Sequence, residues 1–179
     1  MRIIEPVEVE LRGGRIVAVR AAYLTDGPAL LLALESVARE GWLGAAETAR
    51  SVGEARDYIS RHGRHDALLL VAMDRGHLAG ACGLTPEPDG APGVLELGMF
   101  LTLAWRGSGL AQRLLETALD WARESDWRRV VLSVLLTNQR AIAFYRKMGF
   151  VDEGALPVAE HGQREIRMSR SLVASRHGQ

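Results

Sequence analysis

The sequence predicts an α/β fold, with a mixed, largely antiparallel sheet of about six or seven strands flanked by about four helices. The first observation behind this prediction is the mixed order of strand-like and helix-like segments along the chain. The second is the succession of a strand at 94–101, a helix from 110 and a strand at 130–136, because such a right-handed crossover makes the two strands parallel. The third is size and composition: 179 residues, 47% of them hydrophobic, suffice for a single domain with a sizeable core.

The chain begins with a pattern typical of a β-hairpin. Residues 7–11 alternate apolar and charged side chains, Gly13 and Gly14 follow, and a second apolar stretch covers residues 16–19. Alternation on both sides of a Gly-Gly pair predicts two antiparallel strands joined by a tight turn. Residues 1–14 are therefore expected to contribute an extra strand at the N-terminus.

Two consecutive helices are predicted after the hairpin. Thr25 or Asp26 can cap the first helix, in which apolar residues repeat at helical spacing to about Glu40. Ser51 and Glu54 form a capping-box pattern ahead of the second helix, which is expected to end near residue 61.

The rest of the chain alternates apolar runs with turn-forming residues. Gly149 is expected to end the last helix, because glycine readily takes the left-handed backbone that follows a helix. Residues 172–179 are expected to form a disordered tail. The remaining expected elements are, in order, strands at 67–73, 77–84 and 94–101, a helix at 110–122, a strand at 130–136, a helix at 141–148, and strands at 150–151 and 164–171.

The composition excludes several classes of protein. A formal net charge of zero provides no general field to attract nucleic acid. No stretch approaches the roughly 20 apolar residues that cross a membrane, and the N-terminus lacks a signal-peptide pattern, so we expect a soluble, cytoplasmic protein. The single cysteine, Cys82, lies in an expected strand and is predicted to be a buried structural thiol. Arginine replaces lysine everywhere except at Lys147, a bias typical of a GC-rich bacterial genome.

A glycine-rich stretch, WRGSGLA at residues 105–111, lies between an expected strand and an expected helix. The first N–H groups of a helix are unpaired and partly positive, so a phosphate is a natural ligand there, and glycine allows its close approach. The Walker pattern does not fit, and Gln112 stands where the dinucleotide-binding pattern needs its third glycine. From its own residues the stretch is either a structural turn or a binding loop for another phosphate ligand.

A second pattern follows in the stretch TNQRAIAFYRKMGF. Asn138 is well placed to cap a helix, and Tyr145 lies about two turns further along it. Tyr145 shares its helix face with Ala141, Phe144 and Met148, which also fits a tyrosine of the hydrophobic core. These residues alone leave a core role and a functional role open.

Together the two stretches resemble the GNAT superfamily of acyl-CoA-dependent N-acyltransferases. The joint match spans residues 67–153, the preceding helix pair agrees in order, and the first fourteen or so residues lie outside it. The first family signature, glutamine or arginine followed at fixed spacing by glycine and then by glycine or alanine, is matched by Arg106, Gly109 and Ala111. The second signature is matched by Asn138, Ala141, Tyr145, Gly149 and Phe150.

The resemblance implies acetyl-CoA as the donor substrate and no metal ion. Backbone amides of residues 106–111 would hold the pyrophosphate, and the pantetheine arm would lie where residues 99–101 splay from strand 130–136, with a hydrogen bond from Asn138. The implied cofactor-binding residues are Met99, Phe100, Leu101, Arg106, Gly107, Ser108, Gly109, Leu110, Ala111, Asn138 and Ala141. Basic candidates for the nucleotide phosphates, with solvated helix faces as the alternative, are Arg113, Arg140, Arg146 and Lys147.

The resemblance also implies two catalytic residues. Tyr145 would protonate the leaving thiolate, since a phenol with a pKa of about 10 carries its proton at neutral pH. A backbone N–H near residues 99–101 would bind the oxyanion. Glu96 is placed like the catalytic glutamate of the histone-acetyltransferase branch and would act as the base through a water relay, with a salt-bridged or strand-edge acid as the alternative. Ser133 stands where the ribosomal-protein branch carries its glutamate, which counts against that branch's mechanism.

The closing segment, GFVDEGALPVAEHGQREIRMSRSL, resembles more loosely the bacterial branch that acetylates small amines and amino acids, including phosphinothricin-like compounds. We therefore expect direct acetyl transfer, in a ternary complex, to the primary amine of a small molecule or amino acid. Glu40, Glu47 or Glu160 could pair with its ammonium group or be solvated, and His161 is expected to be exposed. Protein N-terminal or lysine acetylation and a non-catalytic CoA-binding regulatory module are the alternatives. A homodimer would agree with the family's frequent pairing of subunits.

Overall fold

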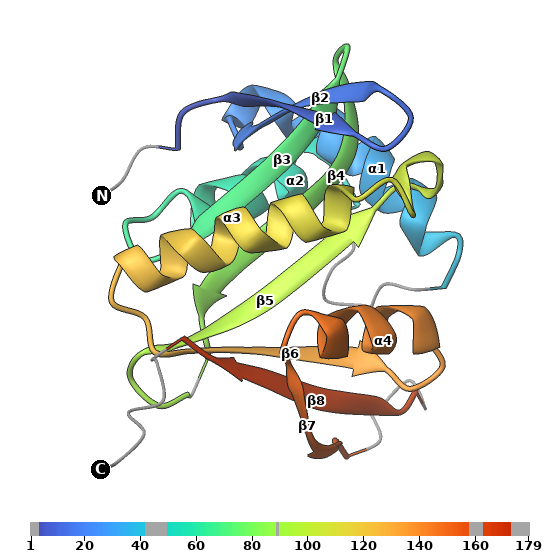
Figure 1. The fold of residues 1–179 in the computed structure, drawn as a ribbon. Helices are drawn as coiled ribbons and strands as arrows, with labels where there is room; N and C mark the ends of the chain where they lie inside the picture. Colours follow the sequence, from blue (N-terminus) through green and yellow to red (C-terminus); the bar gives the residue numbers. More distant parts are fainter. Residues whose placement is uncertain (1–3, 42–49, 89, 158–162, 173–179) are drawn as a thin grey trace. The chain divides into compact units, whose positions relative to one another are not determined.

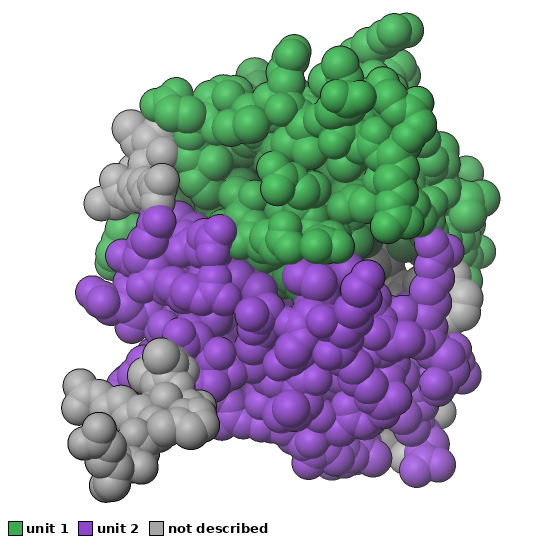
Figure 2. Space-filling view, in the orientation of Figure 1, with its two compact units in different colours: residues 1–85, 98–118 green, residues 86–97, 119–179 purple. Residues whose placement is uncertain are grey.

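The computed structural model describes residues 4–41, 50–88, 90–157 and 163–172. They form two compact units (Figure 2): unit 1 comprises residues 1–85 and 98–118, and unit 2 comprises residues 86–97 and 119–179. The strands are β1 (Val7–Leu11), β2 (Arg15–Ala21), β3 (Leu68–Asp74), β4 (His77–Pro86), β5 (Val94–Leu101), β6 (Arg129–Leu135), β7 (Val151–Ala155) and β8 (Glu165–Ser171). The helices are α1 (Gly27–Ala38), α2 (Val52–His62), α3 (Leu110–Glu124) and α4 (Gln139–Lys147), with short 3-10 turns η1 (Leu24–Asp26) and η3 (Leu103–Trp105). Strand β5 and helix α3 each run from one unit into the other.

The strands are hydrogen bonded in the order β1-β2-β3-β4-β5-β6-β8-β7. Strands β5 and β6 are parallel, and the pairs β1–β2, β2–β3, β3–β4, β6–β8 and β7–β8 are antiparallel. The predicted α/β class, the largely antiparallel sheet and its parallel pair are thus confirmed. In the described part of the chain the sheet has eight strands rather than six or seven, because β1 joins it as a full edge strand beside β2.

In unit 1 the predicted hairpin forms. Strand β1 pairs with β2 over its whole length, and β2 pairs in turn with β3. Gly13 and Gly14, in the turn between them, have φ values of 81° and 72°. Side chains rarely tolerate this left-handed backbone, so the Gly-Gly pair is what allows so tight a turn.

Helices α1 and α2 pack together and bury their apolar faces against strands β3 and β4 of unit 1 (Figure 1). The consecutive β3 residues Leu70 and Val71 are both fully buried although they point to opposite faces, so both faces of this strand are covered. The core between helices and strands is formed by Leu30, Ala33, Leu34, Ala55, Ile59, Leu69, Val71, Leu78 and Ala81.

The two predicted helix caps of unit 1 have different outcomes. Ser51 accepts a hydrogen bond from the Glu54 N–H at 3.1 Å and begins α2, as the capping-box pattern predicts. Asp26, and not Thr25, stands at the N-cap position before α1, but its side chain makes no capping hydrogen bond. Its carboxylate instead accepts hydrogen bonds from Arg20, at 2.7 and 2.8 Å, and from the Tyr23 N–H at 2.7 Å. Burial alone would raise the pKa of Asp26, but these donors hold it below the ordinary value.

In unit 2, β6 lies between β5 and β8. Residues 94–96 of β5 pair in parallel with residues 129–131 of β6, and β6 pairs with β8 over its whole length. Strand β7 pairs with β8 through an irregular register between Asp152 and Gly154. Helix α4 stops before Gly149, whose φ of 81° confirms the predicted left-handed residue at this position.

Candidate functional site

The glycine-rich stretch forms a tight loop between β5 and α3 in unit 1. After the η3 turn, Gly107 and Gly109 take φ values of 79° and 96°, a backbone that favours glycine. The Ser108 side chain is buried: its hydroxyl donates to the Trp105 carbonyl at 2.6 Å and accepts from the Leu110 N–H at 3.3 Å. The loop is therefore closed by its own hydrogen bonds.

Backbone N–H groups along this loop are alternately bonded and open. Those of Arg106 and Ser108 donate to carbonyls of the η3 turn, at 3.3 and 3.4 Å. Among the N–H groups of residues 106–112, those of Gly107, Gly109, Ala111 and Gln112 make no hydrogen bond within the described residues. Open N–H groups at the N-terminus of a 15-residue helix attract an anion. Of the amides at residues 106–111 that the resemblance assigns to the pyrophosphate, those of Gly107, Gly109 and Ala111 are open in this structure, and so is that of Gln112, which neither signature includes.

The side chain of Arg106 holds the loop to the rest of unit 1. Its guanidinium donates to both carboxylate oxygens of Glu40, at 2.6 and 2.8 Å, and to the Leu101 carbonyl, at 3.1 and 3.2 Å. This fork-to-fork geometry is among the stronger polar contacts in proteins. Glu40, which lies just beyond the end of α1, is a predicted partner for an acceptor ammonium, but in the structure it pairs with Arg106.

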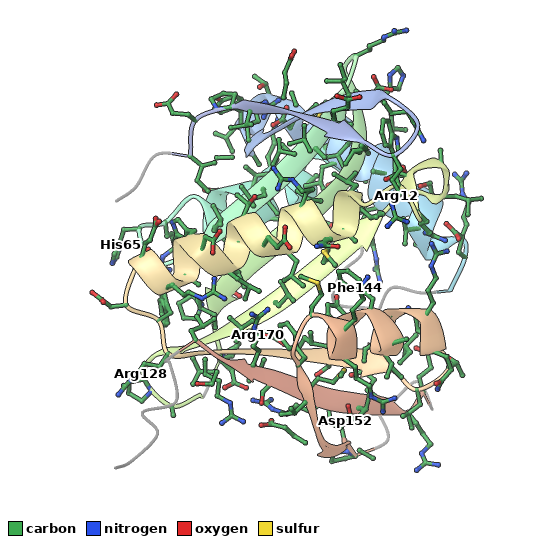
Figure 3. The ribbon with its side chains drawn as sticks, viewed as in Figure 1. Arg12, His65, Arg128, Phe144, Asp152 and Arg170 are labelled. Carbon is green, nitrogen blue, oxygen red and sulfur yellow. The ribbon has the colours of Figure 1, made fainter. Side chains whose placement is uncertain are left out.

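The turn between β1 and β2 contacts the same loop. The guanidinium carbon of Arg15 lies 3.4 Å from the centroid of the Trp105 ring, and its Nη1 donates to the Ala104 carbonyl at 2.6 Å. The Arg12 N–H donates to the Ser108 carbonyl at 3.1 Å. Figure 3 shows Arg12 beside the N-terminal end of α3. Neither signature includes Arg12 or Arg15, so these contacts could not be predicted from the signatures.

The end of β5 in unit 1, residues 99–101, lies close to β4. The Thr102 N–H donates to the Ala79 carbonyl at 3.0 Å. A Cβ atom on Gly80 of β4 would stand 2.8 Å from the Phe100 carbonyl oxygen. Glycine at this position is therefore explained by the close approach of the β5 backbone. All three predicted residues of this segment are partly buried.

Helix α4 in unit 2 positions Asn138 and Tyr145. The Oδ1 atom of Asn138 accepts from the Ala141 N–H at 3.2 Å, which confirms the predicted cap. Within the described residues its side-chain NH2 group makes no hydrogen bond and is free to donate. Tyr145 is 7% exposed, and its ring packs edge to face against Phe144 and Phe150 at centroid distances of 5.4 and 5.6 Å. Tyr145 is thus packed as a core residue, and its role as an acid stays a prediction.

Glu96 lies on β5 in unit 2, opposite Val131 of β6. Its side chain is accessible to solvent, yet the protein around it desolvates the carboxylate enough to raise its pKa. The negative charges of Glu87 and Glu165 raise this pKa further, and Arg167 partly offsets them. A raised pKa makes a carboxylate a stronger base, which suits proton transfer near neutral pH.

Two of the charged residues that influence the pKa of Glu96 form ion pairs with residues other than Glu96. Arg167 pairs with Glu87 and, at 3.1 Å, with Glu153. Among the residues that the structure describes, Glu96 itself forms no ion pair. Its carboxylate therefore differs from the salt-bridged acid that the sequence left open as an alternative.

The other residues singled out in the sequence are either paired, exposed or buried as follows. Arg146 pairs with Asp152, and Ser133 is exposed on β6. Cys82 is fully buried in β4 as predicted, and burial raises the pKa of its thiol to about 12. The other basic candidates, all exposed on α3 or α4, are Arg113, Arg140 and Lys147. Outside the described residues lie Glu47, Glu160, His161 and the tail from residue 173.

The predicted site residues are divided between the units. Unit 1 holds residues 99–101 and the loop 106–111, and there hydrogen bonds join the loop to Glu40 and to the β1–β2 turn. Unit 2 holds Glu96 on β5, and Asn138, Ala141 and Tyr145 at α4.

In the described part of the chain, no three His, Cys, Asp or Glu side chains gather as metal ligands would. None of its helices has both the length and the apolar character needed to cross a membrane.

Known proteins share this combination of elements. The family model of the acetyltransferase (GNAT) family matches residues 27–150. The uncharacterized N-acetyltransferase YjgM of Escherichia coli K12 is 30% identical over 160 residues, which cover 86% of this chain and 94% of that protein. Mouse N-acetyltransferase 8F1 is 30% identical over 131 residues, which cover 70% of this chain but only 58% of the mouse protein. The structure of yncA, a putative acetyltransferase from Salmonella typhimurium with its cofactor acetyl-CoA, has a TM-score of 0.77 at 18% identity, covering 91% of this chain and 98% of that one.

Proposed function

Because the chain belongs to the acetyltransferase (GNAT) family, we propose that it transfers an acetyl group from acetyl-CoA to the nitrogen of a primary amine. The neutral amine attacks the thioester carbonyl carbon, a C–N bond forms, and the C–S bond breaks. The nitrogen gives up a proton, and the departing thiolate takes one. Residues 1–179 act as one domain in this proposal, since the matched range 27–150 includes parts of both units.

The observation that carries the proposal is the row of open N–H groups at the start of α3. Four backbone donors, those of Gly107, Gly109, Ala111 and Gln112, are unused within the described residues. The loop that presents them is held by its own hydrogen bonds and by Arg106. Donors already fixed in place bind an anion without the cost of ordering them, so the pyrophosphate of acetyl-CoA is the ligand we assign to this loop.

We assign each chemical role to a residue from the contacts that this residue makes within its own unit. A backbone N–H of residues 99–101 would stabilise the oxyanion, and the open NH2 group of Asn138 would donate to the pantetheine arm. Glu96 would accept the amine proton through water, since its pKa is raised and no ion pair within the described residues occupies it. Tyr145 would return a proton to the thiolate.

Gly109→Val should raise the KM for acetyl-CoA by about tenfold or more, equivalent to about 1.4 kcal/mol of binding free energy. Valine is strained at a φ of 96°, and relief of that strain would move the N–H groups on either side. Steady-state kinetics with varied acetyl-CoA measures the effect. Gly76→Val is the matched control, because Gly76 has a φ of 85° in the β3–β4 turn and, like Gly109, open space around its Cβ position. A similar rise in KM for both variants would contradict the assignment of the loop.

The acceptor we propose is a small molecule or amino acid. The support is the likeness of the closing segment to small-amine acetyltransferases, together with Ser133 in place of the glutamate of the ribosomal-protein branch. Acetylation of protein N-termini or lysines is the second candidate. A homodimer belongs to the same proposal, and sedimentation velocity would test it.

A screen of amine acceptors with acetyl-CoA as donor tests the function. Amino acids, polyamines, aminoglycosides and peptides with free N-termini are offered, and release of the CoA thiol is recorded together with the mass of the product. We expect the highest kcat/KM among the small amines. If a peptide has the highest kcat/KM, the proposed small-molecule acceptor is wrong and protein acetylation takes its place. If the protein binds CoA but acetylates none of the acceptors, a regulatory module is favoured instead.

A further inference from the structure

The turn between β1 and β2 lies outside the region that the family model matches, which begins at residue 27. We propose that this turn nevertheless supports the binding of acetyl-CoA, and that Arg15, the first residue of β2 directly after the turn, is a positioning residue that holds the glycine-rich loop ready for the phosphates. The inference rests on the function proposed above.

The first support is the contact of Arg15 with the η3 turn. Its guanidinium stacks on the Trp105 ring at 3.4 Å from guanidinium carbon to ring centroid, and it donates to the Ala104 carbonyl at 2.6 Å. Trp105 is 6% exposed whereas Arg15 is exposed, so the guanidinium covers a buried ring from the surface of unit 1. A planar guanidinium can stack and donate in its own plane at once, which fixes both the ring and the turn that precedes the glycines.

The second support is the backbone contact of Arg12. Its N–H donates to the carbonyl of Ser108 at 3.1 Å. Ser108 lies just before α3, in which the first helical bond runs from the Arg113 N–H to the Gly109 carbonyl at 3.2 Å. The Ser108 carbonyl is therefore outside the helical hydrogen bonds, and its partner is the Arg12 N–H. This bond holds the loop backbone at Ser108, between the open N–H groups of Gly107 and Gly109.

The third support is the contact of the glycine-rich loop with Glu40. Arg106 is fixed to Glu40 and to the Leu101 carbonyl, so the loop is held from the α1 end as well as from the β1–β2 turn. With Arg15 removed, the η3 turn before the glycines would lose its side-chain contact with the hairpin, while the Arg106 and Arg12 contacts would remain. The open N–H groups would then sample more positions, and each phosphate contact would cost ordering entropy on binding.

Arg15→Ala should raise the KM for acetyl-CoA about tenfold and change kcat less than about twofold, because a brace on the phosphate loop acts on donor binding. The discriminating donor is S-acetyl-pantetheine, which has the same thioester but lacks the nucleotide and its pyrophosphate. Its kcat/KM should be the same for the wild type and for Arg15→Ala. Arg75→Ala, which removes the same charge from the β3–β4 turn of the same unit, is the matched control and should behave as wild type.

Arg15→Lys separates positioning from charge. Lysine keeps the positive charge but has no plane that can stack on Trp105 while donating to the Ala104 carbonyl. We expect Arg15→Lys to share most of the rise in acetyl-CoA KM. A normal KM for Arg15→Lys, an unchanged KM for Arg15→Ala, or an equal loss with S-acetyl-pantetheine would each overturn the proposal.

Two measurements keep the result interpretable. Thermal unfolding of each variant shows whether it is folded. If Arg15→Ala does not fold, the acetyl-CoA KM of Arg15→Lys, the smaller change, is used as the test. Turnover of acetyl-CoA by the wild type is measured first. Its absence would refute the proposed function, whereas wild-type turnover together with a normal Arg15→Ala variant refutes only the role of the turn.

Discussion

Replacing Tyr145 by phenylalanine should lower kcat by about 100-fold and leave the KM for acetyl-CoA unchanged, as expected when a general acid is removed. Phenylalanine retains the ring, and with it the edge-to-face packing against Phe144 and Phe150. The variant therefore removes the hydroxyl from a helix whose cap, the Asn138 to Ala141 hydrogen bond, stays intact. Without the proton donor the thiolate must leave as an anion, which slows breakage of the C–S bond.

The nature of the leaving group provides the control for Tyr145. Acetyl transfer from p-nitrophenyl acetate releases a stable phenolate that needs no proton, so Tyr145→Phe should lose little rate with this donor. A thermal unfolding midpoint close to that of the wild type shows that the fold is retained. An unchanged kcat with acetyl-CoA, or the same loss with both donors, would remove Tyr145 from the acid role and leave it as a core residue.

Replacing Glu96 by glutamine should lower kcat/KM for the amine by about 100-fold, because the amide cannot accept a proton. In the wild type the base works only when it is ionised, so activity falls as the pH falls through the pKa of Glu96. Desolvation first, and then the charges of Glu87 and Glu165, raise this pKa above the ordinary value of 4.5. The acidic limb of the pH profile should therefore lie above the pH at which an ordinary glutamate titrates, and it should be absent in Glu96→Gln.

The position of that limb depends on the neighbours of Glu96. Glu87→Gln removes one negative charge and leaves Arg167 with less compensation, and both changes lower the pKa of Glu96. The acidic limb should then move to lower pH, with kcat above it unchanged. Glu35→Gln, a change of the same charge on α1 of unit 1, should not move the limb. A limb that stays in place in Glu87→Gln, or persists in Glu96→Gln, would assign the base to another group.

Local patterns were sufficient for much of the fold. The Gly-Gly hairpin, the Ser51 cap, the Asn138 cap and the left-handed Gly149 each depend on residues within a few positions of one another, and all are present. The predicted Asp26 cap was wrong, because its carboxylate instead accepts two hydrogen bonds from Arg20 of β2, six residues earlier, and one from the Tyr23 N–H. The capping pattern considers only the N–H groups of the helix and so did not reveal this pair.

In the candidate site, too, the features that depend on nearby residues were predicted, and those that depend on distant residues were not. The two signatures placed the phosphate loop before α3 and Asn138 at the start of α4, because both follow from spacing along the chain. The signatures did not reveal the fourth open donor, at Gln112. That N–H belongs to the first turn of α3, and the Ser108 carbonyl before it is bonded to Arg12 of the distant hairpin.

The sequence by itself determined the α/β class, the parallel β5–β6 pair, the family and the position of its glycine loop, since each is encoded in periodicity or short spacing. Only the tertiary structure decided which amides of the loop are open, that Arg106 is bound to Glu40, and that Arg15 holds the turn before the glycines. The physical reason is distance along the chain. Arg106 and Glu40 are 66 residues apart and Arg15 and Ala104 are 89 apart, so these contacts exist only once the packing of unit 1 has brought their backbones together.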